Sequence, residues 1–510
     1  MCEYVDTANV DKLDLLFVID ETEAMSSPQD LLRVQFPRLV ATLTIGQRYP
    51  GDPNPFPPFK SIHLGVVSSD MGLAGVGSVI GCDAMGGDDG QFRHEPLGDG
   101  CDAAYPNFLS FESQAGPDRA KLSMDFACIS ALGTAGCAVR QPLEAALKAL
   151  WPSVYVDAGG NVVDPNPLTF LSVTEQGALG RGDLPIAQGG NAGFLRLDPW
   201  TGISQLAIVV LSDGDDCSVR SPEELGSDSE DDYALRCSEH PEALYNIADR
   251  FVRGLTLLRP GYEDLVLFAG IVGVPPDLVD PEARLRADFS QPGAYARFYD
   301  RILDDPRMQF ARDPENSARL RPCCASGERR ARPARRIVEL AKAFPEHSLI
   351  QSICQDDLAP AIDPLIDALA QATGSRCLSQ QLRRSGSLGP LGSSGKVDCD
   401  VIWQLPAPGA APASTPTHCS DLPFLKRVAR DRANNDRGGE NCLVDQIAVQ
   451  TTQDGTGLEP ASGDGWYYDD FDTTRVCRRD ASQRIAFTAL AKPPPGVISV
   501  LDCAPSALAR

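Results

Sequence analysis

Five continuous apolar runs of strand length, separated by helical patterns, constrain the fold of this chain more than any other feature. The runs span residues 13–19, 62–67, 206–211, 265–272 and, more weakly, 347–353. Such runs are typical of strands buried on both faces, as in a parallel sheet. Apolar residues recur at helical spacing within 139–150, 247–258, 337–341 and 358–369. This alternation predicts an α/β domain built on a doubly wound, mostly parallel sheet.

The chain divides into a large amino-terminal part and a smaller carboxyl-terminal part. Its 510 residues are too many for one ordinary core. We assign residues 11–375 to the α/β domain, with loop-rich insertions at about 71–127, 151–200 and 275–332. A Gly/Ser-rich stretch and the run PAPGAAPASTP then predict a linker over 376–418. For 419–510 we expect a small cysteine-rich domain, mainly β, because small cores need cross-links.

Sixteen cysteines indicate structural disulfides. No two of them form a Cys-x-x-Cys pair, which excludes the commonest zinc and redox motifs. Six fall in locally paired neighbourhoods: Cys82 with Cys101, Cys128 with Cys137, and Cys217 with Cys237. The sequence leaves the connectivity open. The cysteines predict an oxidising location, outside the cell, on its outer surface or in a periplasm, and insertions held down by disulfides.

The charge and the amino terminus restrict the partners further. The net charge of −24 disfavours nucleic acid, because phosphate backbones repel such a chain. No stretch approaches the roughly 20 apolar residues of a membrane-spanning helix. No leader is visible either, so we expect that one is missing from this sequence. Cys2 stands where a bacterial lipoprotein begins after cleavage and is a candidate for lipidation, although an ordinary disulfide role or a misassigned start also fits.

Acidic and hydroxyl side chains come directly after the predicted strands, at the edge where α/β proteins bind ligands. Asp20 and Thr22 follow the first run, Asp213 follows the third, and Thr134 precedes the first helical pattern. The carboxyl ends of parallel strands meet at one edge, so we expect these four side chains to converge. Their oxygens suit a hard divalent cation, Mg²⁺ or Mn²⁺, with Ca²⁺ as a further candidate. Capping of the following helices by Asp20 and Asp213 is the alternative.

The motifs and their order resemble the von Willebrand factor A (VWA) domain, in particular secreted or lipid-anchored members from predatory and soil bacteria. Asp20-x-Thr22-x-Ala24 is similar to the family's Asp-x-Ser-x-Ser motif, Gly133-Thr134 to its threonine loop, and Ser212-Asp213-Gly214 to its aspartate loop. The resemblance covers about residues 11–375 and extends to the stretches LGTAGC, FLR and SDGDDCS. It implies a metal-ion-dependent adhesion site at which an acidic group of a protein or glycan partner completes the coordination of the cation.

One departure from the family's motif opens alternatives. Ala24 replaces a serine that ligates the metal in the family, which implies weak or lost cation binding. We therefore expect an exported binding module, not an enzyme, with a degenerate adhesion site. One alternative is a metal-free structural protein of the cell envelope. Another is a metal-assisted, phosphatase-like hydrolase with Asp20 as nucleophile, although Thr22 stands where that chemistry needs a second aspartate.

Overall fold

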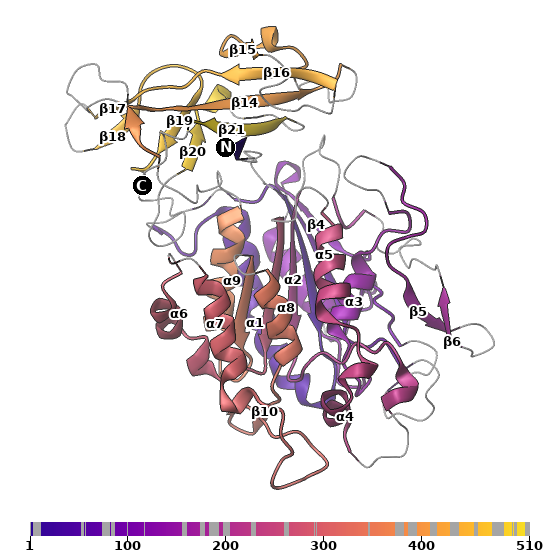
Figure 1. Ribbon diagram of the computed structural model, residues 1–510. Coiled ribbons are helices and arrows are strands. Elements are labelled where there is room, and N and C mark those ends of the chain that lie inside the picture. The colour runs from indigo at the N-terminus through magenta and orange to yellow at the C-terminus, as the bar shows by residue number, and fades with distance from the viewer. Residues whose placement is uncertain are drawn as a thin grey trace.

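The architecture comes from a computed structural model of the whole chain (Figure 1). It describes residues 2–3, 12–52, 56, 58–73, 82, 87–98, 100–116, 118–155, 161–173, 179–182, 193–196, 204–225, 231–259, 265–289, 291, 293–344, 347–372, 382–385, 395–408, 416–428, 438–452, 457–471, 484–491, 493 and 497–504.

A six-stranded sheet forms the centre of the amino-terminal part. Its order is β11 (Ser348–Ser352), β8 (Val266–Val272), β7 (Gln205–Leu211), β2 (Lys12–Ile19), β3 (Ser61–Ser68) and β4 (Leu109–Glu112). The first five are parallel, and β4 runs antiparallel to β3 at one edge. All five predicted strands are therefore present, and the predicted α/β class with a mostly parallel sheet is confirmed. The apolar runs are continuous because both faces of the central strands are buried.

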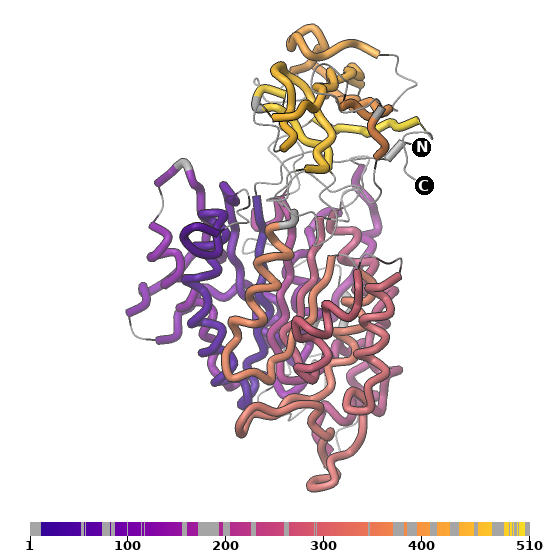
Figure 2. Tube along the Cα trace, turned by 90° about the vertical axis from the view of Figure 1, so that its left-hand side faces the viewer, coloured from indigo at the N-terminus to yellow at the C-terminus, as the bar shows by residue number. Residues whose placement is uncertain are grey.

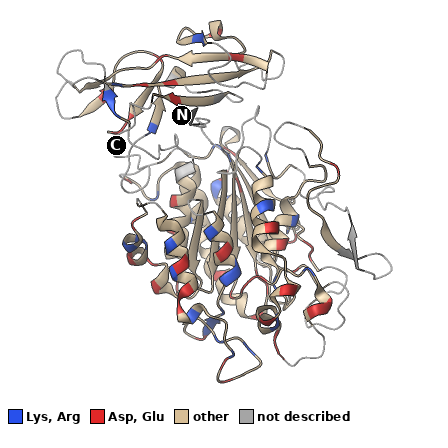
Figure 3. Cartoon of the chain, in the orientation of Figure 1, with Lys and Arg blue, Asp and Glu red and all other residues tan. Residues whose placement is uncertain are grey.

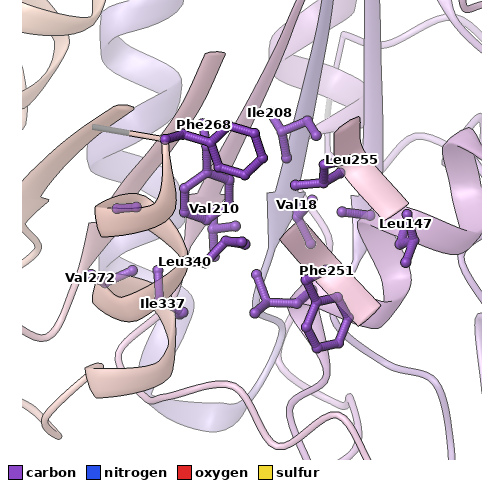
Figure 4. Close-up of a cluster of buried hydrophobic side chains, with 14 of the residues drawn as sticks. Val18, Leu147, Ile208, Val210, Phe251, Leu255, Phe268, Val272, Ile337 and Leu340 are labelled. Carbon is purple, nitrogen blue, oxygen red and sulfur yellow. The ribbon is translucent and has the colours of Figure 1, made fainter. Parts of the chain in front are cut away.

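Helices cover both faces of this sheet. The described α-helices are α1 (Ser26–Ile45), α2 (Arg119–Ile129), α3 (Pro142–Leu150), α4 (Tyr233–Glu239), α5 (Arg253–Leu257), α6 (Pro281–Ala287), α7 (Ala294–Asp304), α8 (Arg335–Ala343) and α9 (Ala359–Ala372). Helix α4 lies at the end of the sheet, outside the two cores on its faces. One core joins one side of the strands to α3, α5, α7 and α8, and Figure 4 shows part of it, including Val18, Phe251 and Phe268. The other core joins Leu15 and Phe17 to α1, α2 and α9. Side chains of β2 alternate between the two cores, as the period of a strand requires.

The three predicted insertions carry more regular structure than we expected. Stretch 71–127 contains β4 and most of α2, and 151–200 contains the hairpin of β5 (Phe170–Val173) and β6 (Leu179–Gly182). Stretch 275–332 contains α6, α7 and the hairpin of β9 (Cys324–Ser326) and β10 (Arg329–Ala331). Gly, Asp and Pro concentrate in the connections between these elements, so composition alone did not reveal them.

Disulfides cross-link the insertions to the core. Six are present among the described residues: Cys82–Cys137, Cys101–Cys128, Cys217–Cys237, Cys324–Cys354, Cys399–Cys503 and Cys419–Cys442. The pairing of Cys217 with Cys237 matches its predicted neighbourhood. The other two neighbourhoods are cross-linked to each other instead. Helix α2, which the sequence analysis missed, ends next to Cys101 and so carries Cys128 to it, while the loop after α2 carries Cys137 to Cys82.

The carboxyl-terminal part is an antiparallel sheet with its own core. Its order is β1 (Cys2–Glu3), β21 (Ile498–Cys503), β14 (Cys399–Pro406), β16 (Gly438–Val444) and β15 (Leu425–Val428). Short pairs of strands accompany it: β12 (Arg384–Ser385) with β13 (Lys396–Val397), β17 (Val449–Thr451) with β18 (Leu458–Pro460), and β19 (Trp466–Asp469) with β20 (Arg484–Phe487). The buried Trp403 and Trp466 anchor this core. Strand β14 lies inside the stretch 376–418 that we expected to be a linker, so the small domain begins earlier than predicted.

The two sheets occupy different ends of the molecule. Figure 1 shows the carboxyl-terminal sheet at one end of the molecule, beside the marks for the two chain ends, with α4 and β10 at the opposite end. The turned view in Figure 2 shows the same separation. Among the described residues, none of the helices combines the length and the apolar character that crossing a membrane requires.

A buried ionic cluster holds one insertion at the amino edge of the large sheet. Asp14, on β2, is fully buried and accepts hydrogen bonds from the Nε (2.7 Å) and the backbone N–H (2.9 Å) of Arg196. Nη2 of Arg259 lies 3.3 Å from the same carboxylate, and the Ser204 hydroxyl also donates to it. Phe194 packs against Phe92 next to this cluster. The FLR stretch (residues 194–196) is thus bound to the amino edge of the sheet through Arg196 and Asp14.

Candidate functional site

Asp20 and Asp213 meet at the carboxyl edge of the sheet, as predicted. They follow β2 and β7, which are neighbours, and the Asp20 backbone N–H donates to the Leu211 carbonyl at 2.9 Å. Asp20 is 1% exposed and Asp213 is 6% exposed. Burial of two carboxylates at one site is expensive without a positive partner, so the identity of that partner determines what the site can do.

The partner within the chain is the guanidinium of Arg140. Its Nε donates to Oδ2 of Asp20 at 2.6 Å, and its Nη2 donates to Oδ1 of Asp213 at 2.8 Å. The same Nη2 lies 2.9 Å from Oγ1 of Thr22. Three of the four predicted metal ligands are therefore together, and a buried guanidinium bonds to all three. A guanidinium presents donors in a fixed planar fork, which matches this set of oxygens.

Neighbouring backbone and side-chain groups donate the remaining hydrogen bonds to Asp20 and Asp213. Oδ1 of Asp20 accepts the backbone N–H of Thr22 at 2.9 Å, and Oδ2 also accepts the Ser212 hydroxyl at 2.7 Å. The Asp213 carbonyl accepts the backbone N–H of Arg332 at 2.8 Å. Both carboxylate oxygens of Asp20 are thus bonded within the protein. A role as nucleophile would need one of them to be released.

Local backbone contacts fix Arg140 in this position. The Arg140 carbonyl accepts the N–H of Cys217 at 2.7 Å, and the Gln141 N–H donates to the Ser69 carbonyl at 2.9 Å. Gly214 lies against the arginine side chain, since a Cβ there would lie 3.0 Å from its Cδ and 3.3 Å from its Cζ. Any larger residue at 214 would press on the guanidinium, which gives the glycine of the SDG stretch a packing role.

Burial raises the pKa values of the Asp20 and Asp213 carboxyl groups, whereas the Arg140 guanidinium lowers them. Burial favours the neutral form of Asp20, but Arg140, Ser212 and Thr22 outweigh it and hold its pKa below the ordinary value. Burial raises the pKa of Asp213 above its ordinary value, opposed by Arg140 and reinforced by the Asp20 charge. The pKa of Arg140 is raised, because its two carboxylate partners outweigh burial. The site therefore holds Asp20 ionised and Arg140 charged.

The fourth predicted ligand, Thr134, lies on the rim of the site. It is exposed, and the structure shows no side-chain hydrogen bond for it among the described residues. Its loop is tied to the site through Gln29 on α1, whose amide nitrogen donates to the carbonyls of Asp20 and Gly133 at 2.9 Å each. Ala24, the departure from the family's motif, is also exposed. The structure thus brings three predicted site residues together and leaves Thr134 outside their hydrogen-bond network.

This arrangement does not fit a resident divalent cation. Mg²⁺ or Mn²⁺ would need the same oxygens of Asp20, Thr22 and Asp213 that Arg140 bonds, in a near-octahedral shell. The ion would also have to enter next to a buried positive charge or displace it. Either event is unfavourable in a buried site, where charge repulsion is strong.

The other aspartates of the SDGDDCS stretch cap two helices. Asp215 accepts the backbone N–H groups of Arg336 (3.0 Å) and Ile337 (3.3 Å) at the start of α8. Asp216 accepts the N–H of Leu143 at the start of α3 at 3.1 Å and pairs with the Arg336 guanidinium. Both contacts are those expected of carboxylates at helix amino termini. Helix capping, which we considered for Asp20 and Asp213, is thus found at Asp215 and Asp216.

A further acidic group, Glu21, follows Asp20 in the chain and lies close to the site. It is 7% exposed, and its backbone carbonyl accepts the Gly136 N–H at 3.0 Å. Burial and the charges of Asp88 and Asp70 raise the pKa of Glu21 to about 8, with only Arg93 acting against them. Burial likewise raises the pKa of Asp215 to about 7. Both groups therefore hold a proton more strongly in the folded protein than in the unfolded chain.

The raised pKa values of Glu21 and Asp215 predict that the free energy of unfolding falls as the pH rises. Each has a folded pKa above its unfolded value, so its contribution is complete below about pH 4 and is lost by about pH 7 for Asp215 and pH 8 for Glu21. We expect a loss of roughly 1 kcal/mol per pH unit per group within this window. Thermal melts from pH 4 to 8 measure it. Glu21→Gln should flatten the profile, and an unchanged slope in that variant would contradict the assignment.

A separate cluster of metal-ligand atoms occurs in the carboxyl-terminal sheet. Atoms of Cys419, Glu440 and Cys442 lie within 4.8 Å of one another. The two cysteines form a disulfide with each other, however, and zinc requires thiolates. In the oxidised protein this group is therefore a cross-link beside an acidic residue.

Comparison with known proteins leaves the family of this chain open. No family model matches it, and no curated protein is significantly similar to it. The assignment of its site therefore depends on geometry. Arg140 is the residue that was not predicted, although one signal was present: a basic residue stands two positions before α3, near a helix amino terminus, where the helix dipole favours acidic residues. A cation in that place indicates a buried acidic partner.

Proposed function

We propose that this chain is an exported binding module of the VWA type, which engages a partner at the carboxyl edge of its large sheet without a resident divalent cation. The observation that carries the proposal is the guanidinium of Arg140, which bonds Asp20, Thr22 and Asp213 at 2.6–2.9 Å. In this proposal the family-type site is retained as a scaffold, and an internal cation has taken the place of the metal.

Three further features support the proposal. Six disulfides agree with an oxidising location, which an exported module requires. The predicted motifs come directly after the strands of a mostly parallel sheet with helices on both faces. The loops that surround Asp213 are held by Cys217–Cys237 and Cys324–Cys354, so the edge is a rigid surface of the kind that binding sites use.

The position of the amino terminus is consistent with attachment at the far end. Strand β1 pairs with β21 in the carboxyl-terminal sheet, at the opposite end of the molecule from α4 and β10 (Figure 1). A lipid on Cys2, which remains a prediction, would therefore direct the carboxyl edge of the large sheet away from the membrane.

Cation independence is the prediction that tests this function. We expect the oxidised wild-type protein to show the same melting midpoint in EDTA as in Mg²⁺, Mn²⁺ or Ca²⁺. An ion that binds the folded state would stabilise it by about 2.7 kcal/mol at a hundred times its dissociation constant, which a melting curve resolves. A midpoint that rises with one cation in the wild type, but not in Asp213→Ala, would overturn the proposal in favour of a metal-dependent adhesion site.

A further inference from the structure

An arginine-rich surface lies beside the site in a protein whose net charge is strongly negative. We call residues 311–336 the arginine segment. It contains eight arginines, no lysine and three acidic residues, whereas the whole chain carries −24. It runs from the end of the loop after α7, through the β9–β10 hairpin, to the start of α8. Figure 3, in the orientation of Figure 1, colours basic residues blue along the chain around the position of β10 at this end of the molecule.

The arginine segment is attached to the site and to α4. The backbone N–H of Arg332 donates to the Asp213 carbonyl at 2.8 Å, and the Asp232 N–H before α4 donates to the Ala318 carbonyl at 2.8 Å. The Cys324–Cys354 disulfide joins the hairpin to the end of β11. The segment therefore borders the carboxyl edge of the large sheet.

Five of the eight arginines have structural partners. Arg312 pairs with Asp231 and Glu239, Arg332 with Asp232, and Arg336 with Asp216. Arg335 donates to the carbonyls of Leu303 and Met308. Arg329 donates to the Gln355 carbonyl and lies 3.7 Å from Asp356. These contacts account for the folding of the segment.

The other three arginines are exposed and weakly engaged. Arg330 is 60% exposed and its nearest acidic contact, to Glu315, is 3.8 Å long. Within the described part of the chain, the Arg321 side chain makes one long contact, 3.4 Å, to the Pro306 carbonyl. Among the described residues, Arg319 makes no side-chain hydrogen bond or ion pair, and it is exposed. Glu315, the contact of Arg330, belongs to the same short loop as Arg319, in which the Arg319 N–H bonds the Asn316 carbonyl.

The chemistry of this surface selects its partner. The planar guanidinium of arginine binds a carboxylate through two parallel hydrogen bonds, which the ammonium group of lysine cannot make. The arginine segment contains no lysine, so all its basic side chains can bind carboxylates in this way. The segment has no Phe, Tyr or Trp on which nucleobases or sugar rings would stack. We propose that Arg319, Arg321 and Arg330 form a docking surface for a segment of a partner protein that is rich in Asp and Glu.

This inference rests on the proposed function, because it names the partner class of the same edge. It also differs from the adhesion mechanism of the family in one respect. The carboxylate of the partner meets arginines at the border of the site and not a metal ion within it. Binding should therefore be insensitive to EDTA and weakened by salt, since exposed charge pairs are screened.

A direct binding experiment tests the docking surface. The full oxidised chain is titrated into a fluorescein-labelled peptide of ten glutamates at physiological ionic strength, and anisotropy is recorded. We expect the triple variant Arg319→Gln, Arg321→Gln, Arg330→Gln to bind at least about tenfold more weakly, because each close charge pair contributes to affinity. The matched control removes three exposed arginines elsewhere, Arg253→Gln, Arg286→Gln and Arg383→Gln, and should bind as the wild type does.

The other outcomes separate the two proposals. Equal weakening in the triple variant and in the control would show general charge attraction and overturn the docking surface. Preference for polygalacturonate or polyphosphate over the peptide would overturn the assigned partner class. Binding that requires Mg²⁺ or Mn²⁺ would overturn the metal-free function, whether or not the triple variant is affected. Loss of binding in the triple variant alone, with and without EDTA, would support both.

Discussion

Arg140→Met is expected to destabilise the protein by about 3–5 kcal/mol at pH 7. The substitution leaves Asp20 and Asp213 buried beside each other without a positive partner. Methionine fills similar space, so the loss reports charge and not a cavity. Thermal or denaturant unfolding measures the change, with Arg286→Met as a control because Arg286 is 60% exposed and makes only a 3.6 Å contact to Glu282. A loss below about 1 kcal/mol, the usual value for a surface pair, would contradict a central role for the guanidinium.

The same variant should respond to cations that the wild type ignores. With the guanidinium removed, the oxygens of Asp20, Thr22 and Asp213 become available to a hard divalent ion. We therefore expect Mn²⁺ or Mg²⁺ to raise the melting midpoint of Arg140→Met and to leave that of the wild type unchanged. If neither protein responds, the three oxygens do not form a latent cation site, and the resemblance to an adhesion site is limited to sequence.

The buried strands of the large sheet could be predicted because their apolar runs are visible in the sequence. Strands β2, β3, β7, β8 and β11 are buried on both faces, so their apolar runs are continuous and were visible in the sequence. Helix α1 was missed because its 20 residues carry apolar side chains with little segregation to one face. Strand β14 was missed because a Pro/Ala stretch comes directly after it and made the whole region resemble a linker.

The site was predicted in its position and not in its chemistry. Asp20 and Asp213 could be placed together because they lie at the ends of neighbouring strands of a parallel sheet. Arg140 could not be placed there, since it comes from a different loop. Sequence patterns locate the residues at the end of a strand, but they do not identify a side chain that reaches the same point from elsewhere in the fold. The exposed position of Thr134 also depends on tertiary contacts, chiefly those of Gln29.

Asp14→Ala is expected to cause a loss of similar size at the opposite edge of the sheet, again about 3–5 kcal/mol. Its carboxylate neutralises the guanidinium groups of Arg196 and Arg259, and Arg259 is 1% exposed. Burial lowers the pKa of Arg259 to about 10, which still leaves it charged at neutral pH. Unfolding measurements test the loss, and Asp30→Ala, which removes an exposed pair with Arg33, is the control. A loss no larger than that of the control would show that the ion pairs of Asp14 with Arg196 and Arg259 contribute little to the stability of the fold.

The two variants should differ in their pH dependence, because the charges that they leave behind differ in sign. Arg140→Met leaves two carboxylates, which can take up protons, so its loss should become smaller between pH 7 and pH 5. Asp14→Ala leaves two guanidinium groups, which keep their charge over this range. It also removes a carboxylate 3.7 Å from His63, whose pKa burial and Arg196 already lower and Asp14 raises, so its loss should stay constant or grow toward pH 5. At the carboxyl edge of the sheet, Arg140 is the single positive group between two carboxylates. At the amino edge, Asp14 is the negative group between two guanidinium groups. If both losses show the same pH profile, they arise from packing, and the proposal that Arg140 acts as the internal cation of the site fails with them.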